Sequence, residues 1–280
     1  MLRDYHNAQP SALMTQEPRF KRHLLQATLL LVLGVAWLPS QAAQDCAVIL
    51  MHGKWGGPKS PYLKVLADKI ANTCKVELRD MPWSRIRNYD QTYENALKDM
   101  GQAVQRYRAE GYKKVFIAGQ SFGANAGLAY QAYIGDADGV IALSPGHAPN
   151  YMYSSGLTQQ FVNEAKRAVA SGKPDANISI TDLNQGQRKD FQIRADVLLS
   201  YFDPDGLGNM ARTAAEFKRP TPFLWVIGTH DTLYREGRGY AFDKVPKLPT
   251  NKYLVVNATH ATAPEVASDQ VVEWIKEVLR

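Results

Sequence analysis

Hydrophobic residues along this chain occur in two alternating patterns. A continuous apolar run at 46–53 predicts a strand buried on both faces. The less apolar segment 75–83 predicts a second strand, and further strands are predicted at 114–119, 139–144, 222–228 and 252–256. Segments whose apolar residues recur every three to four positions predict helices at 60–71, 92–107, 122–133 and 263–280. This alternation predicts a parallel sheet covered by helices on both sides.

A long insertion interrupts the alternation between the strands expected at 139–144 and 222–228. Residues 156–173 have helical spacing, and residues 177–195 contain two strand-like stretches around a turn, which predicts a hairpin. Ligands of such sheets bind where strands end, which is also where this insertion leaves the sheet. We therefore expect a cap at about residues 145–205, not a separate domain.

The N-terminal segment has the features of a secretory signal. Basic residues precede an apolar run at 24–38, and small residues follow near Ala42. This run is shorter than the roughly 20 residues of a spanning helix. We expect a signal peptide over residues 1–42, export to the periplasm or the medium, and no stable membrane insertion afterwards. Both Met1 and Met14 fit as the first residue.

The amino-acid composition is typical of a globular protein, and we expect residues 43–280 to form one domain. The whole sequence has 280 residues, is 45% hydrophobic and has a formal net charge of +6. Its basic residues are scattered, which argues against a nucleic-acid partner. No cysteine or histidine pair has metal-ligand spacing, and no G-x-G-x-x-G follows a strand, so we expect no metal and no nicotinamide cofactor.

The segment Gly119-Gln120-Ser121-Phe122-Gly123 is a G-x-S-x-G motif between a predicted strand and a predicted helix. So sharp a turn strains the backbone at the serine, and side chains at the two glycines would collide. The turn raises the serine hydroxyl above the sheet edge, at the positive end of the following helix. In this context the motif predicts a nucleophilic serine.

A nucleophilic serine needs a base, and the base needs an orienting acid. Asp231 follows the strand at 222–228, and His260 follows the strand at 252–256. Both residues should therefore reach the sheet edge at which Ser121 lies.

Other residues compete for these two roles. His230 adjoins Asp231 and is the alternative base, whereas Asp203 and Asp205 are alternative acids. Of the remaining histidines in residues 43–280, His52 lies in a loop after the first strand, and His147 lies at the start of the insertion.

Four segments resemble the α/β-hydrolase family: GQSFG at 119–123, GTHD at 228–231, NATH at 257–260 and MHGKWGG at 51–57. The resemblance covers nearly the whole domain. It implies Ser121 as nucleophile, Asp231 as acid and His260 as base, in that chain order. It also implies an α/β-hydrolase fold, with a mostly parallel sheet of about six strands and the 75–83 strand at one edge.

The same resemblance implies an oxyanion hole. Its first donor would be the backbone N–H of Phe122, and the second would be that of Lys54, with Trp55 as the alternative. The HGKW loop departs here from the HGGG form of some lipases, and we expect the side chain of Lys54 at the surface. We expect the aromatic residues Trp55, Tyr151 and Tyr153 to bind the substrate.

Cys46 and Cys74 each open a predicted strand. In the resembling fold these two strands are neighbours, which implies a disulfide in an exported protein. Two buried free thiols are the alternative.

The sequence thus indicates an exported serine hydrolase that cleaves a small-molecule ester through an acyl-enzyme. A thioesterase or amidase activity is an alternative, and so is a binding protein that has kept the fold without the chemistry. The acyl preference does not follow from the sequence.

Overall fold

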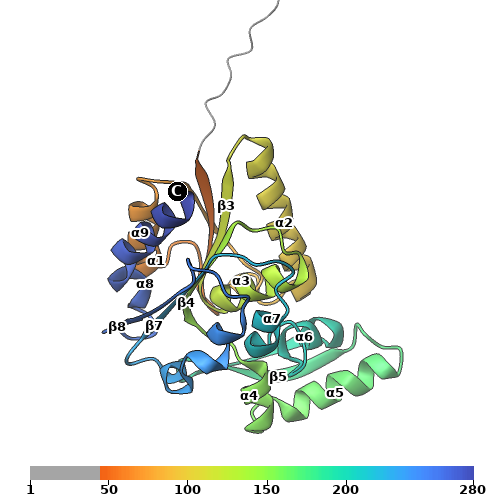
Figure 1. The fold of residues 1–280 in the computed structure, drawn as a ribbon. Helices are drawn as coiled ribbons and strands as arrows, with labels where there is room; N and C mark the ends of the chain where they lie inside the picture. The colour runs from red at the N-terminus through yellow and green to blue at the C-terminus, as the bar shows by residue number, and fades with distance from the viewer. Residues whose placement is uncertain (1–44) are drawn as a thin grey trace, which may run out of the picture. The chain divides into compact units, whose positions relative to one another are not determined.

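The computed structural model describes residues 45–280, and its centre is a six-stranded parallel sheet (Figure 1). The strands are β1 (Cys46–Met51), β2 (Lys75–Arg79), β3 (Lys114–Ser121), β4 (Gly139–Pro145), β7 (Phe223–Gly228) and β8 (Lys252–Val256). Their order is β2-β1-β3-β4-β7-β8, and every neighbouring pair is parallel. The predicted fold and the edge position of β2 are confirmed. The predicted signal peptide, residues 1–42, lies outside the described residues.

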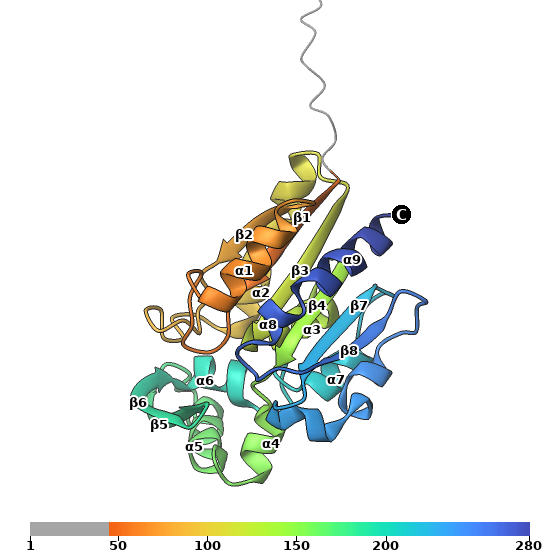
Figure 2. The ribbon, with the colours of Figure 1, turned by 90° about the vertical axis from the view of Figure 1, so that its left-hand side faces the viewer.

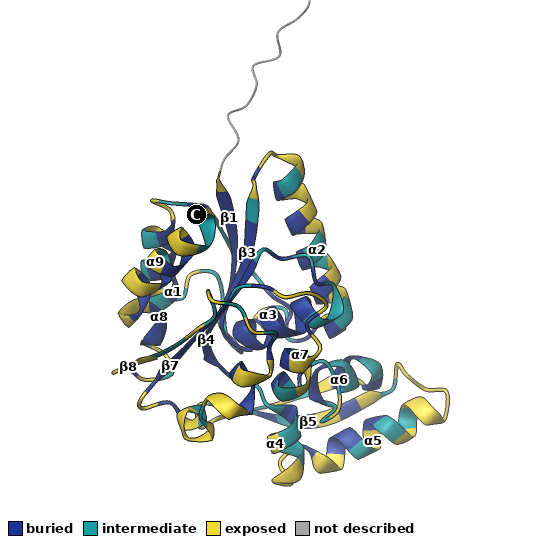
Figure 3. Ribbon diagram, in the orientation of Figure 1, coloured by how far each residue is buried: buried dark blue, intermediate teal, exposed yellow. Residues whose placement is uncertain are grey.

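Helices cover both faces of the sheet (Figure 2). The helices are α2 (Tyr93–Ala109) and α3 (Phe122–Tyr133) on one face, and α1 (Pro61–Ile70), α8 (Ala263–Val266) and α9 (Ser268–Leu279) on the other. Because both faces are covered, the central strands are buried along their whole length (Figure 3), which explains their continuous apolar runs. The last predicted helix is in fact two, α8 and α9, separated at Ala267.

The segment between β4 and β7 lies beyond the carboxyl ends of the strands (Figure 1). Its elements are α4 (Pro149–Ser154), α5 (Gln159–Ala170), β5 (Asn177–Asn184), β6 (Gln187–Arg194), α6 (Ala195–Phe202) and α7 (Met210–Ala215). The strands β5 and β6 pair antiparallel, and the turn residues Gln185 and Gly186 have φ values of 49° and 78°. Positive φ at both positions is typical of a type I′ turn. We call β5, β6 and this turn the hairpin.

The edge strand β2 is shorter than its apolar pattern predicts. It ends at Arg79, and the chain then turns inward so that Trp83 is fully buried. The indole of Trp83 stacks on the ring of Phe122 with 4.7 Å between centroids, and its Nε1 donates to the carbonyl of His52 at 2.8 Å. The apolar residues after Arg79 thus support the loop beside the nucleophile motif.

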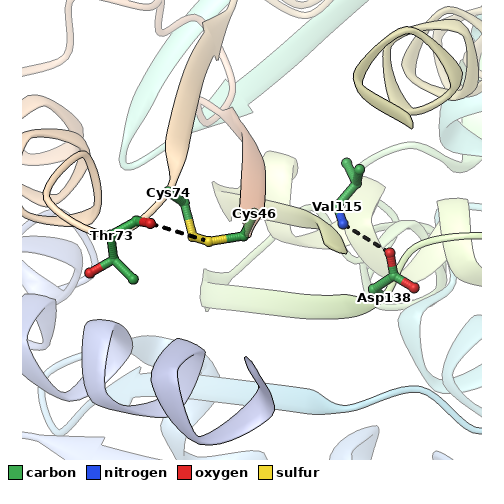
Figure 4. The surroundings of a disulfide bond; sticks show 5 residues. All are labelled: Cys46, Thr73, Cys74, Val115 and Asp138. Carbon is green, nitrogen blue, oxygen red and sulfur yellow. Dashed lines mark hydrogen bonds between the residues drawn. A yellow bond between two sulfur atoms is a disulfide. The ribbon is translucent and has the colours of Figure 1, made fainter. Parts of the chain in front are cut away.

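At the amino ends of the strands, Cys46 and Cys74 form a disulfide with their Cα atoms 4.8 Å apart (Figure 4). It joins the starts of β1 and β2, whose register places Ala47 opposite Lys75. The predicted disulfide is confirmed. In the part of the chain that the structure describes, no helix has the length and hydropathy that crossing a membrane requires.

Candidate active site

Ser121 is the last residue of β3 and directly precedes α3, with φ 54° and ψ −114°. This is a strained backbone conformation for a residue with a side chain. A Cβ atom on Gly119 would lie 2.3 Å from the carbonyl carbon of Gly123, and one on Gly123 would lie 2.7 Å from the carbonyl oxygen of Met51. The turn therefore requires glycine at both flanking positions of the motif.

His260 and Asp231 form a hydrogen-bonded pair at the same end of the sheet. The distance from His260 Nδ1 to Asp231 Oδ2 is 2.7 Å, and the other carboxylate oxygen accepts from the N–H of Leu233 at 3.0 Å. The carboxylate side chain is 1% exposed, and the imidazole is 15% exposed. With Nδ1 donating to the carboxylate, Nε2 is the acceptor nitrogen, and it has no hydrogen-bond partner within residues 45–280.

Ser121 and His260 both border Gly146, the first residue after β4. A Cβ atom on Gly146 would lie 2.7 Å from Ser121 Oγ and 3.3 Å from His260 Cε1. The N–H of Gly146 also donates to the carbonyl of Ser121 at 3.1 Å. The structure thus brings the serine, the histidine and the aspartate of the predicted triad to one place.

The competing residues lie elsewhere. His230 is exposed, and its Nε2 lies 3.1 Å from Asn257 Oδ1. Asp203 accepts from Lys166 at 3.1 Å, and Asp205 is exposed. None of these three residues contacts His260 in the described hydrogen-bond network.

His52 shapes the loop that follows β1. Its Nδ1 lies 2.8 Å from the carbonyl of Gly53, and its Nε2 accepts from the N–H of Met81 at 3.0 Å. These partners fit a neutral imidazole with the proton on Nδ1. Burial lowers the pKa of His52, although nearby Asp80 opposes this, so the neutral form is favoured.

The peptide N–H of Lys54 is oriented by the same loop. The carbonyl of Gly53 and the N–H of Lys54 belong to the same peptide group. This carbonyl also accepts from the N–H of Gly56 at 3.0 Å. In a trans peptide the N–H points opposite to the carbonyl, so fixing one fixes the other. The N–H of Trp55, the alternative oxyanion donor, is already donated to the carbonyl of Trp83 at 2.8 Å.

The side chain of Lys54 does not lie at the surface, so that expectation is wrong. The residue is 7% exposed, and its Nζ lies 2.6 Å from Asp182 Oδ1 on β5. Sequence patterns give no sign of this pairing because the two residues are 128 positions apart.

Two hollows meet at Ser121. The larger, of about 370 Å³, extends toward α4 and the loop after β7, and the smaller, of about 240 Å³, extends toward the loop after β1. Both are lined by Lys54, Ser121, Asn184, Gln185 and His260. The hairpin residues Asn184 and Gln185 therefore border both hollows.

The three aromatic residues expected at the substrate site have different positions. Tyr151 lines the larger hollow, and its hydroxyl donates to Glu236 at 2.9 Å. Trp55 is buried and lines neither hollow, and Tyr153 donates instead to Asn163 at 2.8 Å. The cleft also has lining residues that no motif marked: Met152, Leu183, Met210, Leu233 and Glu236.

Two further residues support the site and were not assigned roles from sequence. Gln120 donates from Nε2 to the carbonyls of His260 at 3.1 Å and Ala261 at 3.3 Å. His147 stacks on Phe122 with 3.8 Å between centroids, and burial, with nearby Lys54, holds its pKa well below the ordinary value. Gln120 lies within the motif, so its position could have suggested such a role.

No group of three or more His, Cys, Asp or Glu side chains in residues 45–280 is arranged to hold a metal ion. The groups that the structure places at this site are the serine, the histidine–aspartate pair and the backbone N–H groups beside them.

Comparison with known proteins identifies the fold. No protein-family model and no curated protein matches the sequence. Among solved structures, α/β hydrolase GrgF from Penicillium sp. sh18 is 15% identical, with a TM-score of 0.62 over 85% of this chain and 90% of that chain. Est1E from Butyrivibrio proteoclasticus is 15% identical, with a TM-score of 0.59 over 85% of this chain and 90% of that chain. The monoacylglycerol lipase of Paleococcus ferrophilus is 21% identical, with a TM-score of 0.58 over 83% of this chain and 94% of that chain.

These structures share the layered parallel sheet described above, and the chain has the α/β-hydrolase fold of esterases and lipases. A fold does not by itself assign an activity, which has to be argued from the site.

Proposed function

We propose that this protein is a serine hydrolase that cleaves carboxylic esters. The observation that carries the proposal is the 2.7 Å pair of His260 and Asp231, in which the second imidazole nitrogen is unpartnered in the described chain. His260 and the strained Ser121 both border Gly146. A base held in one tautomer beside a serine is the arrangement that activates a hydroxyl.

The reaction begins when His260 Nε2 takes the proton of Ser121 as the serine oxygen bonds to the ester carbonyl carbon. Asp231 holds the imidazole and stabilises its charge. The N–H groups of Phe122 and Lys54 donate to the oxyanion, whereas the N–H of Trp55 is occupied. His260 then gives its proton to the departing alcohol, which leaves an acyl-enzyme.

Water completes the cycle. His260 takes a proton from the water molecule as its oxygen bonds to the acyl carbon, and the proton returns to Ser121 when the acid leaves. Enzyme, water and ester thus give free enzyme, acid and alcohol.

The names of the similar structures favour an ester over a thioester or an amide. They include an esterase and a monoacylglycerol lipase, and one structure of Est1E holds ferulic acid. A cleft with both polar and apolar lining residues fits a small ester with some polar groups.

We also propose that the protein is exported. The Cys46–Cys74 disulfide suits an oxidising compartment, and the sequence of residues 1–42 predicts a signal peptide. Mass measurement of the protein in separate cell fractions would test export through the fraction that contains the protein. The same measurement would test signal cleavage through the first residue of the chain.

The test of the activity is labelling by a fluorophosphonate together with turnover of p-nitrophenyl esters of increasing acyl length. We expect Ser121→Ala to lose both, whereas Ser171→Ala, an exposed serine at the end of α5, should retain both. A wild-type protein that neither labels nor turns over any ester would instead be a binding protein, and the proposal would be wrong. Matched thioester and anilide substrates would compare the alternative chemistries.

A further inference from the structure

The ion pair of Lys54 and Asp182 connects the loop after β1 to the hairpin, deep in the protein. Nζ and Oδ1 are 2.6 Å apart, and the two side chains are 5% and 0% exposed. Charges buried to this extent lose their hydration, so a pair of well-packed apolar residues is often as stable. An ion pair instead constrains geometry, because it fixes the position of each side chain relative to the other.

Further contacts hold each partner. Asp182 also accepts from the hydroxyl of Tyr89 at 2.9 Å and from the N–H of Leu183 at 2.9 Å. Burial, followed by the charge of Asp182, raises the pKa of Tyr89 well above its ordinary value, so this hydroxyl keeps its proton. The carboxylate therefore has a fixed set of donors and a fixed position.

Lys54 is held by the hairpin at two points. Its Nζ donates to the carbonyl of Leu183 at 3.1 Å as well as to Asp182. Its own carbonyl accepts from Asn184 Nδ2 at 3.0 Å. The ammonium group also lies 5.4 Å from the ring centre of Phe202. The ammonium and the carbonyl of Lys54 are thus bound by the hairpin, and its N–H is the group that the proposed mechanism uses.

We infer that Asp182 and Asn184 are positioning residues that hold Lys54 as the second oxyanion donor, so that the hairpin is a fixed wall of the oxyanion hole and not a lid. This inference rests on the proposed function. Misplacing one donor weakens an interaction that is strongest in the transition state, so the loss falls on kcat and not on substrate binding.

A fixed hairpin also limits the path of the substrate. Asn184 and Gln185 border both hollows, so the ester must reach Ser121 through the existing cleft.

The test compares Asp182→Asn with Asp190→Asn, the same change at an exposed hairpin aspartate that bonds to Thr181. Turnover is divided by the number of sites that a fluorophosphonate titrates, which removes any effect of unfolded protein. For Asp182→Asn we expect kcat per site to fall about tenfold or more, with KM within about twofold, because one donor is misplaced. The inhibition constant of a boronic acid, which forms a tetrahedral adduct, should rise by the same factor. Asp190→Asn should match wild type.

Equal kcat per site for Asp182→Asn and wild type would overturn the inference. If Asp182→Asn does not fold, the double variant Lys54→Met with Asp182→Leu removes both charges and keeps the backbone N–H. The same loss of kcat is then expected, and wild-type kcat would again overturn the inference.

Hydrogen exchange separates this inference from the proposed function. Exchange in residues 53–57 should be faster in Asp182→Asn than in Asp190→Asn, whether or not the protein hydrolyses esters. Unchanged exchange there would overturn the positioning role. A wild-type protein without labelling or turnover but with this exchange difference would overturn the proposed function alone.

Discussion

The two ends of the central sheet differ in backbone strain and in how many buried polar atoms lack a partner. At the amino ends of the strands, the disulfide joins β1 to β2, and Asp138 accepts from the N–H of Val115 at 2.9 Å (Figure 4). At the carboxyl ends, Ser121, Ser144 and His147 have φ values of 54°, 39° and 62°. Ser144 Oγ, His147 Nδ1 and His260 Nε2 are buried there without a partner among residues 45–280.

This difference separates stability from chemistry. Strained backbone and unpartnered buried polar atoms each cost free energy, and they concentrate at functional sites, where the surrounding structure maintains them. Changes at the carboxyl ends should therefore affect turnover first, and changes at the amino ends should affect only the free energy of unfolding.

The largest effect is expected from His260→Ala. It removes the proposed base, so kcat for a p-nitrophenyl ester should fall by roughly 10⁴–10⁶-fold. Asp231→Asn should cost somewhat less, because the base remains and only its orienting partner is changed. Steady-state kinetics on the folded variants measures both losses.

His230→Ala is the matched control for the base. This exposed histidine bonds to Asn257 and not to the catalytic residues we propose, so its loss should change kcat less than about threefold. An inactive His230→Ala beside an active His260→Ala would refute the assignment of the base.

The disulfide should have the second largest effect, on stability alone. Its cysteines are 28 positions apart, and on the chain-entropy model a loop of this size contributes roughly 3–4 kcal/mol. The double variant Cys46→Ser with Cys74→Ser should lose about that much free energy of unfolding in urea. Because the bond lies opposite the cleft, turnover at room temperature should not change.

Two measurements can contradict this. Alkylation of two thiols in the unreduced, exported protein would show that the bond does not form in solution. Loss of turnover in a variant that is still folded would show that the two ends of the sheet are not independent.

Much of the fold could be predicted because the apolar pattern reports burial directly. The runs in β1, β4 and β7 are continuous because helices cover both faces of those strands. The predicted β2 was too long because Trp83, although apolar, packs under a loop and not within a strand. A residue's apolar character predicts that it is buried but not which element it belongs to.

The site was predictable where chain order determines position. Ser121 ends β3, and Asp231 and His260 follow β7 and β8, so the parallel pairing of the sheet brings the three residues to the same end. The contacts of the Lys54 side chain depend on a hairpin far along the chain. The burial of Trp55 depends on the direction in which its side chain points. Such details follow from tertiary packing, which a single sequence pattern does not contain.

The third largest effect is a loss of stability at low pH, which we expect from two buried histidines at the carboxyl ends of the strands. Burial lowers the pKa of His52 from its ordinary value of 6.5 and that of His147 further still. When the pH falls below this ordinary value of 6.5, both histidines become protonated in the unfolded chain but stay neutral in the folded protein. The free energy of unfolding should therefore fall as pH decreases, by up to roughly 1.4 kcal/mol per pH unit for each histidine.

Urea unfolding between about pH 7.5 and pH 5.5 measures this slope. His147→Asn should reduce the slope, since asparagine tolerates the positive φ and does not titrate. His230→Ala, at an exposed position, should leave it unchanged. A free energy of unfolding that stays constant or increases as the pH is lowered through this range would contradict the expectation.

The smallest effect is expected from Gln120→Ala, at the carboxyl end of β3. Gln120 Nε2 donates to the carbonyls of His260 and Ala261, so it holds the loop that carries the proposed base without touching the reacting atoms. Losing two such bonds costs about 1–2 kcal/mol, and part of this should reach the transition state, so kcat should fall by about three- to tenfold. KM and fluorophosphonate labelling at saturation should stay near wild type, and Gln102→Ala, an exposed glutamine on α2, should change none of these. A wild-type kcat in Gln120→Ala would mean that the Asp231 bond alone positions His260, and that the loop's own hydrogen bonds belong to the stability of the fold.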